Sequence, residues 1–179
     1  TKTAVAAGAT VAATPAELAS GVEVVITILT NAAAIDAVYY GDHGLLAGEV
    51  KGKLFIEMST VRPETERALA EWVALKHAQL VECPVGGTVG PAKEGKLFGL
   101  VGSDAAALDR ARPLLEQLCR RIEHVGPVGA GAAMKLAINL PLIVFLQAFG
   151  EAVALTKPLG IDPARLIEIF SDTSGAATV

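Results

Sequence analysis

Short apolar runs and longer segments with helical spacing alternate along the chain. The clearest run is Val22 to Leu29 (VEVVITIL), whose β-branched residues are typical of a strand buried on both faces of a sheet. The other predicted strands are Lys53 to Met58, Gln79 to Cys83, Leu97 to Val101, Ile122 to Val125 and, with a weaker pattern, Thr10 to Ala13. Helical segments lie between them, so the pattern predicts βαβ units and a mainly parallel sheet.

Several of the predicted helices follow a residue that suits a helix N-terminus. Thr14 precedes a helix at Pro15 to Ser20, and Ser103-Asp104 precedes a helix at Ala105 to Leu118. Further helices are predicted at Ala32 to Tyr39 and Pro63 to His77.

The pattern changes after Gly129. Ala130 to Lys157 is one long and mostly apolar helical segment, and a second helix, Pro163 to Phe170, follows Asp162 as its cap. We therefore predict an α/β fold: a Rossmann-like doubly wound parallel sheet in residues 1–128, then the start of an all-helical domain in residues 129–179. Because both ends of the chain look cut, the sheet is expected to lack its first βαβ unit. A helix apolar on all sides must be covered by further chain or by a partner subunit, as in a homodimer or homotetramer.

Composition and charge exclude several classes of partner. The net charge is −4 and the basic residues are scattered, so no positive stripe for nucleic acid is present. The most apolar stretch, Leu140 to Leu155, contains Gln147 and Glu151 and is short for a bilayer, so a buried helix and no membrane association are predicted. The two cysteines form no CxxC motif and the three histidines show no metal-ligand spacing, which predicts no metal site, no disulfide and a cytoplasmic location.

Gly129-Ala130-Gly131 imitates a dinucleotide-binding fingerprint, because it follows a predicted strand and opens a helix. The third glycine position is Met134, where close helix–strand packing needs a small residue. Glu151, at the distance expected of a ribose-binding acid, lies inside a helical pattern. We therefore assign no pyrophosphate site here, and expect the true fingerprint to precede this chain.

Polar residues follow two predicted strands, at the edge where open parallel sheets bind ligands. Ser59-Thr60 closes the strand that ends at Met58, and Leu29-Thr30-Asn31 ends the preceding strand. Hydroxyl groups at these positions can reach a ribose or a nicotinamide. The alternative for each group is structural: Ser59 or Thr60 caps the next helix, and Asn31 caps its own.

Two further features carry candidate chemistry. The segment PVGGTVG (84–90) has three glycines whose backbone N–H groups could hold a carboxylate, or it is simply a flexible loop. Lys135 and Asn139 share one face of the long helix among apolar neighbours. Desolvation there would lower the pKa of Lys135 toward a general acid/base range. The alternative is a lysine that extends its amine to solvent.

Three segments occur in an order and spacing that resemble the landmark motifs of the β-hydroxyacid dehydrogenases, the 3-hydroxyisobutyrate dehydrogenase family. They are EMSTVRPET (57–65), ECPVGGTVGPAKEGKL (82–97) and GPVGAGAAMKLAIN (126–139). The resemblance covers nearly the whole chain, from AAGATVAATPAELA near the start to GEAVALTKPLGID (150–162).

The resemblance implies a role for each matched residue. Lys135 matches the catalytic lysine and Asn139 the asparagine beside it. The implied substrate-binding residues are Gly86, Gly87, Thr88 and Asn139, and the implied cofactor-binding residues are Leu29, Thr30, Ser59 and Thr60, with NAD or NADP as the cofactor.

The chain departs from the family at five positions. Thr30 replaces a usual proline, Gly86 a usual serine, Thr88 and Pro91 usual glycines, and Ile138 a frequent second asparagine. The loss of a serine hydroxyl at Gly86 leaves the identity of the substrate open.

The resemblance predicts an oxidoreductase that transfers a hydride between a nicotinamide cofactor and the β-carbon of a small hydroxyacid or semialdehyde. The alternatives are a reductase of the same fold that acts on an imine or succinic semialdehyde, and a cofactor-binding module without turnover. Lys135 favours the dehydrogenase, because imine reductases and non-catalytic relatives generally lack this lysine.

Overall fold

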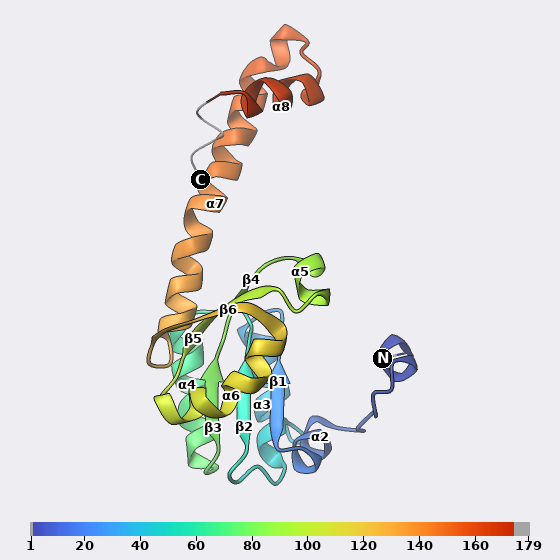
Figure 1. The fold of residues 1–179 in the computed structure, drawn as a ribbon, viewed down its shortest axis with the longest axis vertical. Coiled ribbons are helices and arrows are strands. Elements are labelled where there is room, and N and C mark those ends of the chain that lie inside the picture. Colours follow the sequence, from blue (N-terminus) through green and yellow to red (C-terminus); the bar gives the residue numbers. More distant parts are fainter. Residues whose placement is uncertain (1, 174–179) are drawn as a thin grey trace. The chain divides into compact units, whose positions relative to one another are not determined.

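The computed structural model describes residues 2–173, and a mixed six-stranded sheet covered by helices forms its first part (Figure 1). The strand order is β1-β2-β3-β5-β4, with β6 on the other side of β5. The strands are β1 (Val24–Thr27), β2 (Leu54–Glu57), β3 (Gln79–Glu82), β4 (Val85–Gly86), β5 (Leu97–Gly102) and β6 (Cys119–Gly126).

Helices connect most of the strands and follow the last of them. The α-helices are α1 (Lys2–Ala6), α2 (Pro15–Gly21), α3 (Ala32–Tyr40), α4 (Pro63–Leu75), α5 (Val89–Lys93), α6 (Ala105–Leu118), α7 (Ala130–Thr156) and α8 (Pro163–Ser171). Two 3₁₀ turns, η1 (Leu45–Ala47) and η2 (Lys157–Leu159), complete the elements. The predicted alternation of strand and helix, followed by a helical part, is confirmed.

The sheet is parallel from β1 to β3 and reverses direction at β5. The chain leaves β3 through Pro84, continues into β4 and returns after the short helix α5, so β4 and β5 pair as antiparallel neighbours. That connection is shorter than the dozen or more residues that a parallel crossover needs. The antiparallel pair was not predicted, because the apolar runs show where strands lie but not their direction.

The strands are buried because helices cover both faces of the sheet (Figure 1). Leu54 and Ile56 of β2 pack in the cluster that includes Leu108 and Leu115 of α6. Phe55, between them, faces the opposite cluster with α3 and α4. The sequence of β2 is a continuous apolar run because each face of the strand packs in its own hydrophobic cluster.

Three of the predicted N-terminal caps are present. The side chain of Thr14 accepts from the N–H of Glu17 at 3.1 Å, and that of Asp104 accepts from Ala107 at 2.8 Å. Asn31 caps α3 through the N–H of Ala34 at 2.9 Å, which is the structural alternative proposed for it. Asp162 stands at the cap position of α8 but makes no side-chain cap bond.

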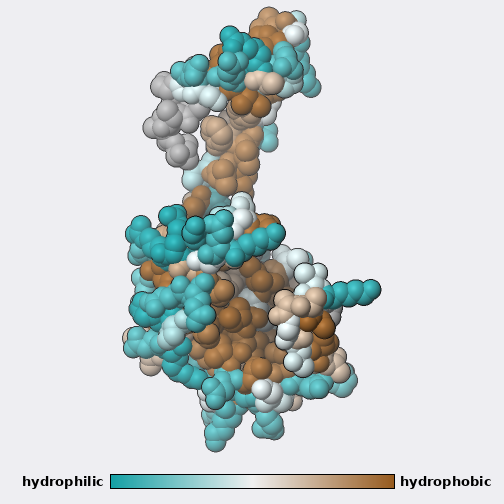
Figure 2. Space-filling view, turned by 45° about the vertical axis from the view of Figure 1, so that its right-hand side comes forward, coloured by the Kyte–Doolittle hydropathy of each residue, from teal (hydrophilic) through white to brown (hydrophobic). Residues whose placement is uncertain are grey.

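The weak strand predicted at Thr10–Ala13 is wrong: these residues form no strand. A strand needs a hydrogen-bonded neighbour, and β1, the nearest candidate, pairs only with β2 among the described residues. β1 is therefore an edge strand, with Ile26 44% exposed and Ile28, just after it, 66% exposed. Figure 2 shows hydrophobic surface gathered on this side of the first unit.

The chain divides into two compact units, one that ends at Leu136 and one that begins at Ala137, so the division falls inside α7. In the second unit, Phe149 of α7 stacks with Phe145 at 6.1 Å between ring centroids and meets the edge of Phe170 of α8 at 5.3 Å. Much of the surface of α7 is apolar (Figure 2), with Leu140, Ile143 and Leu146 about 60% exposed. Within the described residues, the stretch Ala130–Leu159 is long and apolar enough to cross a membrane by length and composition, a test that buried core helices also pass. The helix predicted to be buried is exposed among the described residues.

Candidate active site at the carboxyl edge of the sheet

Three parallel strands end in one row, and this row defines the edge that carries the candidate site. Thr27, Glu57 and Glu82 are the last residues of β1, β2 and β3, and they are aligned in register, Thr27 with Glu57 and Glu57 with Glu82. Leu29-Thr30, Ser59-Thr60 and the glycine segment follow these strands directly. The structure therefore brings all three predicted segments to the same edge of the sheet, where ligands of open α/β sheets bind.

Ser59 joins the ends of β1 and β2. Its hydroxyl accepts the backbone N–H of Leu29 at 2.7 Å and donates to the carboxylate of Glu57, while its own N–H donates to Glu57 Oε2 at 2.8 Å. Ser59 is almost fully buried. These contacts give its hydroxyl a structural role, because they hold the Leu29 turn in place.

Thr60 and Thr30 are exposed at this edge, and Leu29 is half-buried beside them. The N-terminal position of α4 is occupied by Arg62, without a side-chain cap bond, so neither Ser59 nor Thr60 caps that helix. The structural alternative proposed for this pair is therefore wrong. The Thr60 hydroxyl is therefore left exposed at this edge, near the half-buried Leu29.

The glycine segment contains strand β4 and the turn that leads from it into α5. Gly86 belongs to β4, and Gly87 has φ +128, a conformation that favours glycine. A Cβ on Gly87 would lie 2.9 Å from Leu97 Cδ2, so a side chain there would require the Leu97 side chain to shift. Thr88, Val89 and Gly90 follow on the surface, where their backbone amides begin α5.

Lys135 lies near the N-terminal end of α7 and within the first unit. Its side chain is half-buried, and burial lowers the pKa of its amine below the usual value for lysine. The sequence predicted both the partial burial and the direction of the shift. Asn139 is also half-buried and lies on the same helix, in the second unit.

The beginning of α7 is tied to the sheet edge by Glu82. The Oε1 atom of Glu82 accepts the backbone N–H of Gly129 at 2.7 Å and that of Gly131 at 2.6 Å. These two glycines are the ones that imitate a dinucleotide fingerprint. Since their N–H groups bind Glu82, they are not free to bind a pyrophosphate.

Three buried glutamates behind this edge were missed by the sequence reasoning. Glu57, Glu66 and Glu82 are fully buried, and burial is the largest cause that raises the pKa of Glu66 far above its usual range and that of Glu82 to about 7. For Glu66 the neighbouring Glu57 and Glu82 add to the rise, whereas for Glu82 the backbone N–H groups and Arg67 oppose it. A signal was present: both LFIE and QLVE end an apolar strand on an acid, where an ionised side chain is unusual.

Comparisons with known proteins give a consistent family. Residues 1–126 match the family model of the NAD binding domain of 6-phosphogluconate dehydrogenase. The 3-hydroxyisobutyrate dehydrogenase of Pseudomonas aeruginosa is 42% identical over 155 residues, which are 87% of this chain and 52% of that protein. The NAD-dependent L-serine dehydrogenase of the same organism is 37% identical over 171 residues, 96% of this chain and 57% of that protein.

A solved structure supports the same assignment. The 3-hydroxyisobutyrate dehydrogenase of Mycobacterium tuberculosis, determined with L-serine, superposes with a TM-score of 0.80 at 31% identity over 97% of this chain and 59% of that one. The chain thus spans about half the length of the curated relatives it matches.

Proposed function

The chain belongs to the family of the 6-phosphogluconate dehydrogenase NAD binding domain, and we propose that the whole protein is an NAD(P)-dependent β-hydroxyacid dehydrogenase. The proposed reaction moves a hydride between the cofactor and the β-carbon of a small hydroxyacid or semialdehyde. 3-Hydroxyisobutyrate and L-serine are the first substrates to test, since they appear in the names of relatives and of a similar structure.

The carboxyl edge fits a nicotinamide cofactor. Leu29 would give the ring an apolar contact, and its position is fixed by the bond between its N–H and Ser59. Thr30 and Thr60 would offer hydroxyl groups to the ribose, because both are exposed and Thr60 caps no helix. Ser59, which is buried, would act by holding this turn rather than by touching the cofactor.

The reaction then needs a group that moves a proton, and Lys135 is the proposed one. When bound, the cofactor supplies the hydride chemistry. In oxidation the neutral amine of Lys135 accepts the proton of the substrate hydroxyl, and in reduction the ammonium returns it. The backbone N–H groups around Gly86, Gly87 and Thr88 would hold the substrate carboxylate, with Asn139 orienting the reacting oxygen.

The observation that carries this proposal is a half-buried lysine on a helix that starts from the edge where β1, β2 and β3 end. We would titrate the complete protein with NADH and NADPH by fluorescence, then measure turnover with a panel of small hydroxyacids. Cofactor binding with no turnover on any member would refute the enzyme in favour of a binding module.

The second candidate is a reductase of the same fold for an imine or succinic semialdehyde. It is favoured by Gly86, which stands where the family has a substrate-binding serine. The same panel, run in the reductive direction with an imine and succinic semialdehyde included, separates the two. A preference for the imine or for succinic semialdehyde over every other member of the panel would support this candidate.

We propose that α7 is covered by a second subunit in a homodimer or homotetramer. Its side chains at Leu140, Leu142, Ile143 and Leu146 are more than half exposed, which a helix in water does not sustain. The complete protein is expected to sediment as a dimer or larger at micromolar concentration. A monomer in detergent-free buffer would contradict this, and a protein that is extracted only with detergent would indicate a membrane-bound helix instead.

A cytoplasmic location is proposed as well. Cys83 and Cys119 are both buried free thiols, which suits a reducing compartment. Fractionation of cells that express the complete protein, with detection in the soluble cytoplasmic fraction, is the expected result.

A further inference from the structure

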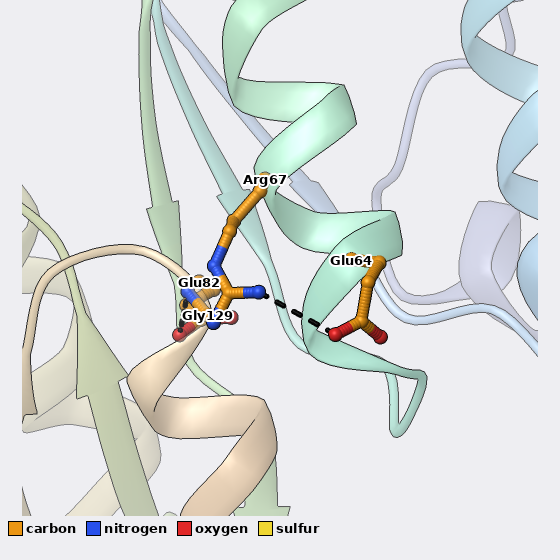
Figure 3. A network of polar contacts seen from close by, with 4 residues as sticks. All are labelled: Glu64, Arg67, Glu82 and Gly129. Carbon is orange, nitrogen blue, oxygen red and sulfur yellow. Dashed lines mark hydrogen bonds and ion pairs between the residues drawn. The ribbon is translucent and has the colours of Figure 1, made fainter.

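The carboxylate of Glu82 is fully buried and binds the start of α7. Its residue has no exposed surface, and its Oε1 atom accepts two backbone N–H groups, from Gly129 at 2.7 Å and Gly131 at 2.6 Å. Figure 3 shows the Glu82 side chain beside Gly129, with Arg67 of α4 close to both. The contact joins the end of β3 to the first turn of α7, across 47 and 49 positions of sequence.

The first turn of α7 has to be capped from elsewhere in the chain. The first N–H groups of a helix have no partner inside the helix, and a nearby Ser, Thr, Asp or Asn side chain usually supplies one. Here the helix is preceded by Pro127, Val128 and Gly129, which have no side-chain acceptor. Glu82 takes that place, and its negative charge also suits the positive end of the helix dipole.

Two glycines make room for this carboxylate, and a third makes room for Arg67 beside it. A Cβ on Gly102, the residue paired with Glu82 across the sheet, would lie 2.0 Å from Glu82 Oε1. A Cβ on Gly131 would lie 2.4 Å from the carbonyl oxygen of Leu100 and 3.1 Å from Glu82 Oε1. Gly129 has φ +96, and a Cβ there would lie 2.7 Å from Arg67 Nε. Gly129 and Gly131, which imitate a dinucleotide-binding fingerprint in the sequence, therefore allow the start of α7 to approach the sheet closely.

We propose that Glu82 is a positioning residue for catalysis: its carboxylate fixes the first turn of α7 to the end of β3, and so sets where Lys135 stands relative to the edge that would hold cofactor and substrate. The inference rests on the proposed function. Glu82 also directly precedes the Cys83-Pro84 step into the glycine turn, so one side chain links the proposed general acid/base to the proposed carboxylate loop.

The ionisation of Glu82 adds a pH dependence. Burial raises its pKa to about 7, against the N–H groups of Gly131, Gly129 and Ala132 and the charge of Arg67. The other titratable groups that interact with it are Glu66 of α4 and the neighbouring Cys83, both with raised pKa values of their own. Hydrogen bonds to an ionised acceptor are stronger than those to a neutral one. The link to α7 therefore tightens as pH rises through about 7.

The test compares Glu82→Ala with Glu82→Gln in the complete protein. The alanine variant loses the acceptor, so the N–H groups of Gly129 and Gly131 lose their partner. We expect amide hydrogen exchange in residues 129–133 to quicken, and kcat to fall on the order of 10–100-fold, as small misplacements of a catalytic group do. The affinity for NADH or NADPH should hold, since Glu82 is buried behind the edge.

Glu82→Gln keeps an acceptor oxygen and removes the charge. This variant should show slow amide exchange in residues 129–133 and most of the wild-type kcat. Its kcat/KM should not rise with pH through about pH 7, as that of the wild type is expected to do. That profile remains a test if Glu82→Ala does not fold. Glu71→Ala, an exposed glutamate of α4, is the matched control and should change none of these readouts.

Some outcomes would overturn the proposal. Unchanged exchange and unchanged kcat in Glu82→Ala would show that Glu82 positions nothing. A wild-type pH profile in Glu82→Gln would remove the proposed dependence on its ionisation. Because hydrogen exchange needs no turnover, faster exchange in Glu82→Ala together with an inactive wild type would refute the proposed function separately, and would leave Glu82 as a helix anchor without a catalytic role.

Discussion

Replacing Lys135 by Ala is expected to lower kcat by about 10² to 10⁴-fold, the usual contribution of a positioned general acid or base. The physical reason is that the amine is half-buried, its pKa is lowered by desolvation, and its helix starts from the edge where the cofactor would lie. Cofactor affinity should change little, because Leu29, Thr30 and Thr60, which would hold it, are untouched. Steady-state kinetics on the complete protein, with the cofactor Kd measured alongside, provide the readout.

Two further variants sharpen this prediction. Lys135→Arg should not restore activity, because a guanidinium stays protonated and cannot accept the substrate proton. Asn139→Ala should be milder than Lys135→Ala, because an orienting amide moves no proton. Lys51→Ala, at an exposed turn before β2, is the matched control. Wild-type kcat in Lys135→Ala would identify Lys135 as a lysine that merely extends to solvent, and the proposed chemistry would lose its proton-transfer group.

The second large effect is the dependence of folding stability on pH that Glu66 is expected to cause. Glu66, in the first turn of α4, is fully buried, and no donor among the described residues reaches either of its carboxyl oxygens. Burial first, and then the charge of Glu57 and contact with it, raise its pKa far above the usual value. Replacing Glu66 by Gln is therefore expected to stabilise the protein at pH 8.

The sign follows from proton binding. Between the usual pKa near 4.5 and the raised native pKa, the native chain keeps the proton on Glu66 and the unfolded chain releases it. Stability therefore falls as pH rises through this window. Glu82, whose pKa is about 7, contributes in the same direction between about pH 4.5 and pH 7. A tenfold difference in proton affinity between the two states corresponds to about 1.4 kcal/mol. We therefore expect Glu66→Gln to raise the free energy of unfolding by at least about 2 kcal/mol at pH 8.

Urea unfolding of the complete protein at pH 5 and pH 8 measures this effect. The wild type should be less stable at pH 8, and Glu66→Gln should lose much of that difference while keeping the part due to Glu82. The range ends at pH 8 to stay below the titration of Tyr39 and Cys83, which are also buried. Glu71→Gln, exposed on the same helix, is the control. A wild type equally stable at both pH values would show that Glu66 is not held protonated.

The candidate site shows how far local sequence reaches. Lys135 could be chosen because a lysine among Met134, Leu136 and Ile138 is unusual, and Thr60 because it ends an apolar strand. The motif order then added the glycine turn and Asn139, whose proposed roles rest on resemblance. Ser59 could not be separated from Thr60 by this reasoning, because only the fold shows that the Ser59 hydroxyl meets Glu57 and Leu29 while Thr60 stays exposed.

By itself, the sequence determined most elements of this protein: the pattern of its apolar residues indicates every described strand except β4, and Thr14, Asn31 and Asp104 set where three helices begin. These are local properties, decided by backbone sterics and hydrogen bonds within a few residues. Tertiary structure decided the direction of β5, the absence of a strand at residues 10–13 and the partner of Gly129 and Gly131. Each of those depends on what lies beside a segment, and Glu82 meets the start of α7 from 47 residues away because the fold brings them together.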